Sequence, residues 1–229
     1  MNTTVASSQR RISLAAGIAY VFTFVSIPSI SLYSSVKGAN YVLSSGSNTS
    51  ALIAGILEIV VALAGIATAV ILFPILKKQN ETLALGLVAA RILESATIFV
   101  GVSFILAIVT LRLSGAGTEG LATSHALVAL YNRIFLLGQS FMPAICDLLL
   151  GYMLYKSRLV PRGLAIIGII GAPVLVVGWL FVLTGTIDRT GGLAKLSALL
   201  VGLFELGLGI WLIVKGFDTE AVATLEAKS

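Results

Sequence analysis

The stretch LSALLVGLFELGLGIWLIV, residues 196–214, contains a single ionisable residue, Glu205, at its centre. Lys195 and Lys215 flank the stretch directly, as interfacial anchors flank a membrane span. About 20 consecutive apolar residues are enough to cross the hydrocarbon core of a bilayer as a helix. The stretch therefore predicts a membrane-spanning helix that carries a carboxylate near the bilayer midplane, where holding a charge costs at least about 2.5 kcal/mol.

Composition extends this reading to the whole chain. Apolar residues make up 58% of the 229 residues and charged residues only 11%, whereas soluble domains contain about 25% charged residues. The net charge is +5, but the basic residues lie at the ends of apolar segments and form no continuous basic face, so we expect no nucleic-acid partner. The bilayer itself is the expected environment of this fold.

Five further stretches resemble 196–214 in length and apolar character, which predicts an all-α polytopic bundle of six transmembrane helices. The six expected spans are residues 12–33, 51–76, 83–111, 124–155, 163–186 and 193–214. Pro143 and Pro173 fall inside the fourth and fifth spans, and each is expected to kink its helix. We expect a tail at residues 1–11, a six-helix domain at residues 12–216 and a second tail at residues 217–229. The tails and the intervening loops are too short for a second soluble domain.

The N-terminus and the loops predict how the chain lies in the membrane. Arg10 and Arg11 before an apolar run resemble a signal peptide, but the run is too long and lacks a convincing cleavage site, so we expect an uncleaved first span. Most Lys and Arg residues fall at the ends of spans that share one side with both termini. We therefore expect a multi-pass protein of the cell (inner) membrane with both termini cytoplasmic.

Two acids lie deep in the predicted membrane. Asp147 and Glu205 are each about 14 to 15 Å along a helix from their nearest inner lysine, near the middle of a core about 30 Å thick. Glu205 shares a helix face with Gly202 and Gly209, and small residues mark the faces where membrane helices meet. Both acids are therefore expected to point into the bundle, where each needs a partner or a proton.

Further polar residues in the spans complete a candidate site. Arg91 and Glu94 are spaced to pair along one helix turn, and Arg91 lies at a depth from which it can reach Asp147. We expect a cluster of these three residues with Glu205 nearby. The other candidate residues are Arg133, Glu58, Ser140 and Gln139, of which Glu58 lies near the outer end of its span and Arg133 has the length to reach an interface.

This cluster leaves two hypotheses for function. Charged residues inside a membrane are functional candidates, so the first is the handling of a proton, an ion or a small amphiphilic ligand. The alternative is a structural or regulatory membrane partner whose buried charges only fix helix packing. A cavity that opens onto Asp147 or Glu205 would favour the first, and closed ion pairs without a void would favour the second.

Catalysis and cofactor chemistry find no support in the sequence. The only histidine, His125, is expected at the outer end of the helix that carries Ser140, so no serine–histidine pair forms. The only cysteine, Cys146, lies in an apolar segment and cannot form an intrachain disulfide. No sequence such as Gly-x-Gly-Asp surrounds the deep acids. We expect no enzyme, no metal and no cofactor.

Four short motifs resemble a bacterial six-helix membrane protein family known only as domain of unknown function 4386. They are RISLAAGIAY (11–20), RILE (91–94), LGYMLYKS (150–157) and VPRGL (160–164). The resemblance extends from Arg11 to Gly216 and implies six transmembrane helices. It implies no particular activity.

Overall fold

The computed structural model describes residues 3–227, with side chains from residue 8, and every regular element in that range is a helix. The long helices are α1 (Thr3–Phe22), α3 (Thr49–Leu76), α4 (Glu81–Leu113), α5 (Gly120–Leu137), α6 (Met142–Ser157), α7 (Arg162–Leu183) and α8 (Gly192–Val214). The short ones are η1 (Thr23–Ser26), α2 (Ser29–Leu32), η2 (Tyr41–Leu43), η3 (Gly117–Glu119) and α9 (Thr219–Glu226).

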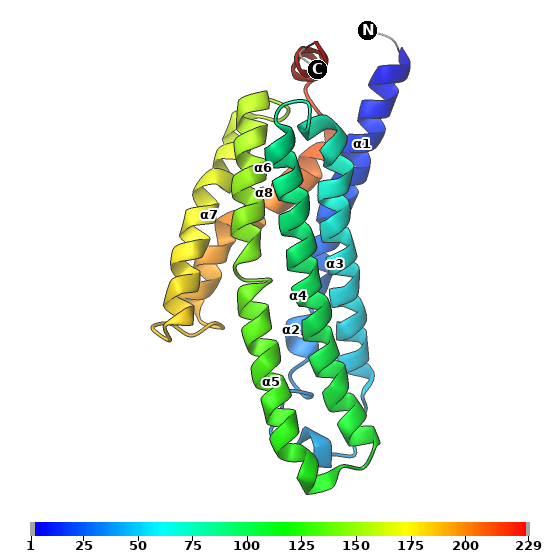
Figure 1. Cartoon of the computed structure of the whole chain (residues 1–229), viewed down its shortest axis with the longest axis vertical. Helices are drawn as coiled ribbons and strands as arrows, with labels where there is room; N and C mark the ends of the chain where they lie inside the picture. The colour runs from blue at the N-terminus through cyan, green and yellow to red at the C-terminus, as the bar shows by residue number, and fades with distance from the viewer. Residues whose placement is uncertain (1–2, 228–229) are drawn as a thin grey trace.

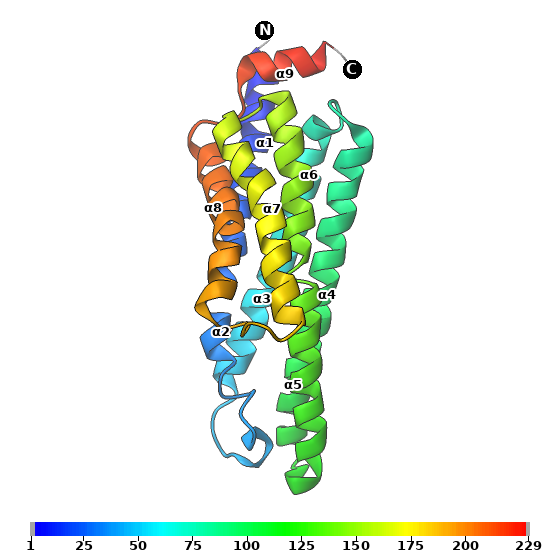
Figure 2. The ribbon, with the colours of Figure 1, turned by 90° about the vertical axis from the view of Figure 1, so that its left-hand side faces the viewer.

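Within residues 3–227, six helical segments are long and apolar enough to cross a membrane, which confirms the predicted six-span architecture. They are Ser8–Leu32, Thr49–Leu76, Glu81–Leu113, Gly117–Ser157, Arg162–Leu183 and Gly192–Val214. The 22 residues of α7 rise about 33 Å, close to the thickness of the hydrocarbon core. α3, α4 and α5 extend beyond the ends of α7 and α8, on the side away from the termini (Figures 1 and 2).

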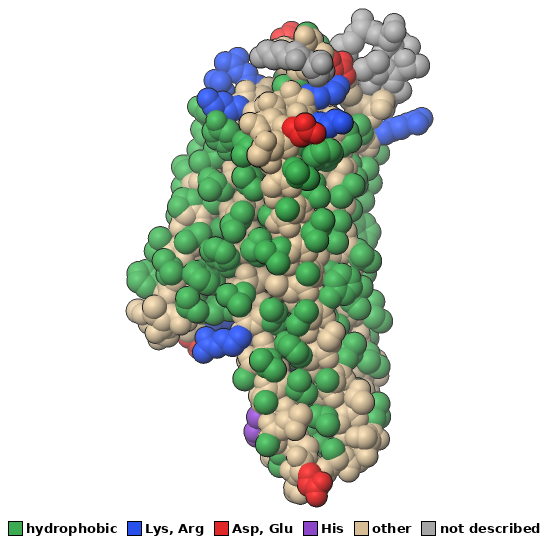
Figure 3. Space-filling model, viewed as in Figure 1, with side chains coloured by type: hydrophobic (Ala, Val, Ile, Leu, Met, Phe, Trp, Pro, Cys, Tyr) green, Lys and Arg blue, Asp and Glu red, His purple; other side chains and the backbone are tan. Residues whose placement is uncertain are grey.

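The spans pack as a closed ring. α1 contacts α3, α3 contacts α4, α4 contacts α5 and α6, α6 contacts α7, α7 contacts α8, and α8 returns to α1. Both described ends of the chain lie at one end of this ring (Figures 1 and 2), and basic side chains gather at that end (Figure 3). Apolar side chains cover the flank of the molecule (Figure 3), as expected for a surface that faces lipid. Side chains that point into the ring are shielded from that lipid.

The first span is interrupted. α1 ends at Phe22, and four residues of 3-10 helix precede Pro28, which caps the short helix α2. Pro28 has no N–H to donate to Phe24, four residues earlier, so the regular α-helical ladder cannot continue through it. The prediction of one apolar span is confirmed, but the span is not one continuous helix.

The fourth span is also interrupted, and here we expected only a kink at Pro143. A turn at residues 138–141 separates α5 from α6, and Pro143 lies in the first turn of α6. A proline is well tolerated at that position because the first turn of a helix needs no internal donor. The proline therefore starts a new helix, and the expectation of a single kinked helix is wrong.

The turn between α5 and α6 is held by its neighbours on both sides. A Cβ at Gly138 would lie 1.8 Å from the hydroxyl oxygen of Thr97, so α4 approaches the turn at a point where only glycine fits. On the other side, the indole of Trp179 in α7 donates to the carbonyl of Leu136 at 2.9 Å. That bond satisfies one of the carbonyls that the end of a helix leaves open.

Candidate functional site

Arg91 lies inside the ring and contacts carboxylates from three helices. Its Nη1 donates to Oε2 of Glu94 on the same helix at 2.9 Å, and its Nη2 donates to Oε1 of Glu205 on α8. The same Nη2 is 3.9 Å from Oδ1 of Asp147 on α6. We call these four residues the central cluster. Arg91, rather than Arg133, is the basic residue that reaches Glu205.

The central cluster contains more acid than base. One guanidinium faces three carboxyl groups, and the side chain of Arg91 is 3% exposed while that of Asp147 is fully buried. Neither oxygen of Asp147 has a hydrogen-bond partner among the described residues. An unpaired ionised carboxylate is costly in such surroundings. The cluster therefore has a deficit of positive charge that bound protons or a bound cation would neutralise.

A cavity of about 160 Å³, which we call the central cavity, lies beside this cluster. Its wall includes Arg91, Glu94 and Glu205 but not Asp147. The side chains of Glu94 and Glu205 keep 11% and 12% of their surface exposed, so both carboxyl groups reach the cavity. The void on which the two functional hypotheses depend is present next to Glu205.

Both helix interruptions line the central cavity. Thr23, Phe24 and Ser26 belong to the break in the first span, while Gln139 and Pro143 belong to the break in the fourth. Irregular backbone at membrane depth is tolerated where it is buried in protein or faces a water-filled space. The two breaks thus bring hydroxyl, amide and backbone groups to the wall that also carries the acids.

The cavity has the size and polarity to hold water and a small charged species. A water molecule occupies about 30 Å³ in the liquid, so the space corresponds to about five waters. No group of three or more His, Cys, Asp or Glu side chains in the described range is arranged to hold a metal ion. The carboxyl groups of Glu94 and Glu205 at the wall can exchange protons or offer oxygens to a cation.

The remaining predicted residues lie in different places. Gln139 lines the central cavity. Ser140 lies in the adjoining turn, where its backbone N–H donates to the carbonyl of Phe135 at 3.1 Å. Arg133 is exposed on α5, and no ion pair of its side chain is recorded in the described range. Glu58 belongs to a separate group of residues.

Glu58 on α3 is the centre of this second group, the distal cluster, on the side of the central cavity away from the termini. Its side chain is buried, and its carboxylate accepts hydrogen bonds from Tyr131 at 2.9 Å, Tyr33 at 3.3 Å and Ser29 at 3.4 Å. The ammonium group of Lys37 lies 4.0 Å from the centre of the Tyr131 ring. The pKa of Lys37 is lowered to about 8, mainly by burial and also by the nearby charge of Arg189, while Glu58 opposes the shift.

Sequence reasoning missed several hydroxyl groups at these sites. Tyr20 of α1 has a buried hydroxyl without a hydrogen-bond partner among the described residues, and its ring centre is 5.8 Å from the guanidinium carbon of Arg91. Tyr33, which follows α2, donates a hydrogen bond from its hydroxyl to Glu58. A tyrosine that shares a helix face with small residues is expected to point into the bundle. Tyr20 shows this pattern, because Ala16 and Gly17 lie one turn earlier in the sequence.

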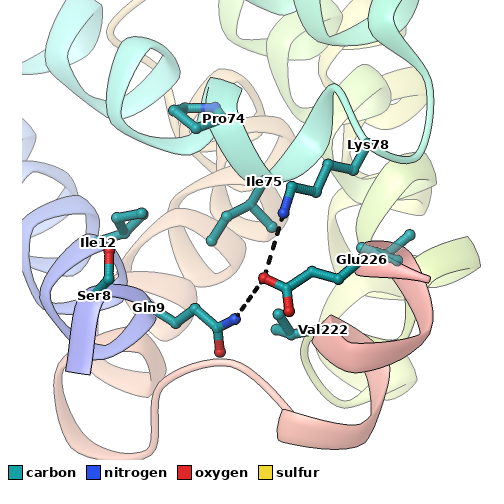
Figure 4. A pocket seen from close by; sticks show the side chains of 9 residues that line it. Ser8, Gln9, Ile12, Pro74, Ile75, Lys78, Val222 and Glu226 are labelled. Carbon is teal, nitrogen blue, oxygen red and sulfur yellow. Dashed lines mark hydrogen bonds and ion pairs between the residues drawn. The ribbon is translucent and has the colours of Figure 1, made fainter. Parts of the chain in front are cut away.

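A larger cavity of about 340 Å³ lies at the end of the bundle that holds the termini, between α1, α3 and α9 (Figure 4). Figure 4 shows Lys78 and Gln9 both pointing toward Glu226, with bond lengths of 3.3 and 3.0 Å. Its floor is apolar and includes Ile12, Ile75 and other aliphatic side chains. The two charges at this cavity pair with each other, so it offers less chemistry than the central one.

Comparison with known proteins gives a family and no activity. No curated protein and no solved structure matches the chain. The model of one family, described as a domain of unknown function (DUF4386), matches residues 15–216. That match covers most of the chain and all of the central and distal clusters, so the chain belongs to the DUF4386 family of membrane proteins.

Proposed function

We propose that this protein is a membrane transport protein whose central cavity binds a positively charged species, either a proton or a small cation. The single observation that carries the proposal is that both helix interruptions and the acid-rich cluster meet at one cavity. Transporters commonly place their binding sites at the bilayer midplane between discontinuous helices. The charge deficit of the central cluster explains why the bound species is positive.

The competing role has its own support in the geometry. Arg91 joins α4 to α8 through Glu205, and such a contact fixes helix register even if nothing binds. A purely structural pair needs one acid for one base, however, whereas Arg91 faces three acids. The surplus acids and the cavity favour binding.

We further propose that the protein lies in the inner membrane with both termini cytoplasmic. The end of the bundle that holds the termini also carries Arg10, Arg11, Lys77 and Lys78, and cytoplasmic loops are enriched in such residues. Reporter fusions in the loop at residues 77–80 should read cytoplasmic, and fusions at residues 114–118 should read external. The opposite pattern would overturn this orientation.

The transport proposal is tested with the purified protein in liposomes. An imposed pH gradient tests for protons through an entrapped pH dye, and gradients of sodium, potassium or tetramethylammonium test for cations. Glu205→Gln keeps the shape of the side chain but not its charge, and it should abolish the flux. Glu81→Gln, at an exposed acid in the first turn of α4, should not change it. If the parent protein moves neither protons nor any of these cations, the proposal fails.

A further inference from the structure

A third, much smaller cavity lies between the central cavity and the distal cluster. Its volume is about 10 Å³, at the lower limit for holding a single water, and its wall includes Glu58, Thr97 and Tyr131. Ile98 and Gln139 line this cavity and the central cavity alike. These two side chains are the common wall between Glu58 and the central acids.

The separation between the two acidic sites is short. Gly65 lines the central cavity and Glu58 lines the small one, and they are seven residues apart on α3. Glu94 and Gly101 show the same seven-residue offset on α4. At 1.5 Å per residue, each offset corresponds to about 10 Å along the bundle. At about 2.8 Å per hydrogen bond, this separation corresponds to about four hydrogen-bonded steps.

The surroundings of Glu58 indicate which species it accepts. From α2 and the residues after it, Ser29, Tyr33 and Lys37 face the carboxylate, and from α5 Tyr131 does so. Arg189, in the loop between α7 and α8, lies close enough to act on the charges of Lys37 and Tyr131. The space of about one water leaves no room for a hydrated metal ion or an organic cation. A proton needs neither an open path nor a hydration shell.

We propose that Glu58 is a second proton-binding residue on a path between the central cavity and the end of the bundle away from the termini, and that the transported species is a proton. In each passage, the O–H bond of the Glu58 carboxyl group breaks and the proton passes to water in the small cavity. Waters of the central cavity carry this same proton to the carboxylate of Glu94 or Glu205, where a new O–H bond forms. The Glu58 carboxylate then regains a proton from water at the end of the bundle away from the termini. Gln139 is a positioning residue that controls whether the two water sites touch. This inference rests on the proposed transport function.

The experiment separates Glu58 from the central acids. Two properties are measured in the same liposome preparation: proton flux under an imposed pH gradient, and labelling of Glu94, Asp147 or Glu205 by a hydrophobic carbodiimide, which reacts with protonated buried carboxyl groups. Glu58→Gln should reduce proton flux at least tenfold and leave pH-dependent labelling of the central acids unchanged. Gln139→Leu removes no charge and should give the same result. It replaces Glu58→Gln as the test variant if Glu58→Gln does not fold.

The outcomes distinguish the two proposals. One outcome is that Glu58→Gln and Gln139→Leu keep proton flux within twofold of the parent while Glu205→Gln loses it. This result would overturn the role of Glu58 and leave the central site standing. Flux of a cation but not of protons through the parent would overturn the proton path and likewise leave the central site standing. Absence of any flux through the parent would overturn both proposals.

Discussion

Replacing Arg91 tests the central cluster most directly. Arg91→Leu removes the only base that contacts Glu94, Glu205 and Asp147 in the described structure, and leaves three carboxyl groups facing one another in a buried space. Removing one member of a buried pair typically costs about 3 to 5 kcal/mol, because the remaining charge loses its partner without regaining water. We expect the free energy of unfolding to fall by about this amount.

The matched control is Arg133→Leu. Arg133 lies in the same span but is exposed on α5, and exposed substitutions usually change stability by less than about 0.5 kcal/mol. A double variant refines the test, because Glu205→Gln should cost less in the Arg91→Leu background than in the parent. For residues in contact, this difference is typically about 0.5 to 3 kcal/mol.

Unfolding is followed in mixed micelles with increasing sodium dodecyl sulfate. Trp179, whose ring centre is 4.6 Å from that of Phe141 beside the break in the fourth span, reports on local packing, and far-UV circular dichroism reports on total helix. Equal stability of Arg91→Leu and Arg133→Leu would refute the reasoning, since it would mean that Arg91 has no charged partners to lose. A double variant with strictly additive losses would refute the direct contact with Glu205.

Three further outcomes follow from the same structure. Gly138→Ala should lower the free energy of unfolding by about 1 to 3 kcal/mol through overpacking against Thr97, and Thr97→Gly in the same chain should recover part of that loss in the same micelle assay. Trp179→Phe removes the bond to the carbonyl at the end of α5 and should cost about 1 kcal/mol. The pKa of Lys37 is lowered in the folded chain, so between about pH 8 and 10.5 the unfolded chain holds a proton that the folded chain has released. The free energy of unfolding should therefore rise with pH across this window. The rise should be smaller in Lys37→Met and unchanged in Lys195→Met.

The sequence was sufficient to predict the six apolar spans. Apolar length sets where a chain can cross a bilayer, and a fixed rise per residue converts position into depth. The small residues beside Glu205 and Asp147 also indicated that both point inward. Arg91 and Glu94 were expected to pair because their spacing is local, and the structure places them 2.9 Å apart.

The partners of the buried side chains could not be predicted from the sequence, because they depend on how the helices are rotated and where they break. The sequence placed Arg91 within reach of Asp147 and left Arg133 able to reach an interface, but only the packing of α4 and α5 decides which partners each arginine has. Glu58 was grouped with the central acids because the sequence does not reveal that Tyr33 and Tyr131 enclose it. The turn at residues 138–141 depends on contacts from α4 and α7, which are distant in sequence. Local propensity at Pro143 predicted a disturbance but not its position.

The ion pairs and the cavity of the central cluster are not alternatives, because one residue contributes to both. Arg91 holds α8 against α4 through Glu205, and the same guanidinium lines the cavity. A species that neutralises Glu94 or Glu205 necessarily weakens their attraction to Arg91, so binding and helix packing are coupled through this side chain. That coupling is the minimum that a transporter requires, since the bound state must favour a different arrangement of the helices. Asp147 is the residue that a purely structural role does not explain. It lies 3.9 Å from Arg91, and its oxygens have no hydrogen-bond partner among the described residues. It therefore adds negative charge to the cluster without adding a well-formed bond between helices.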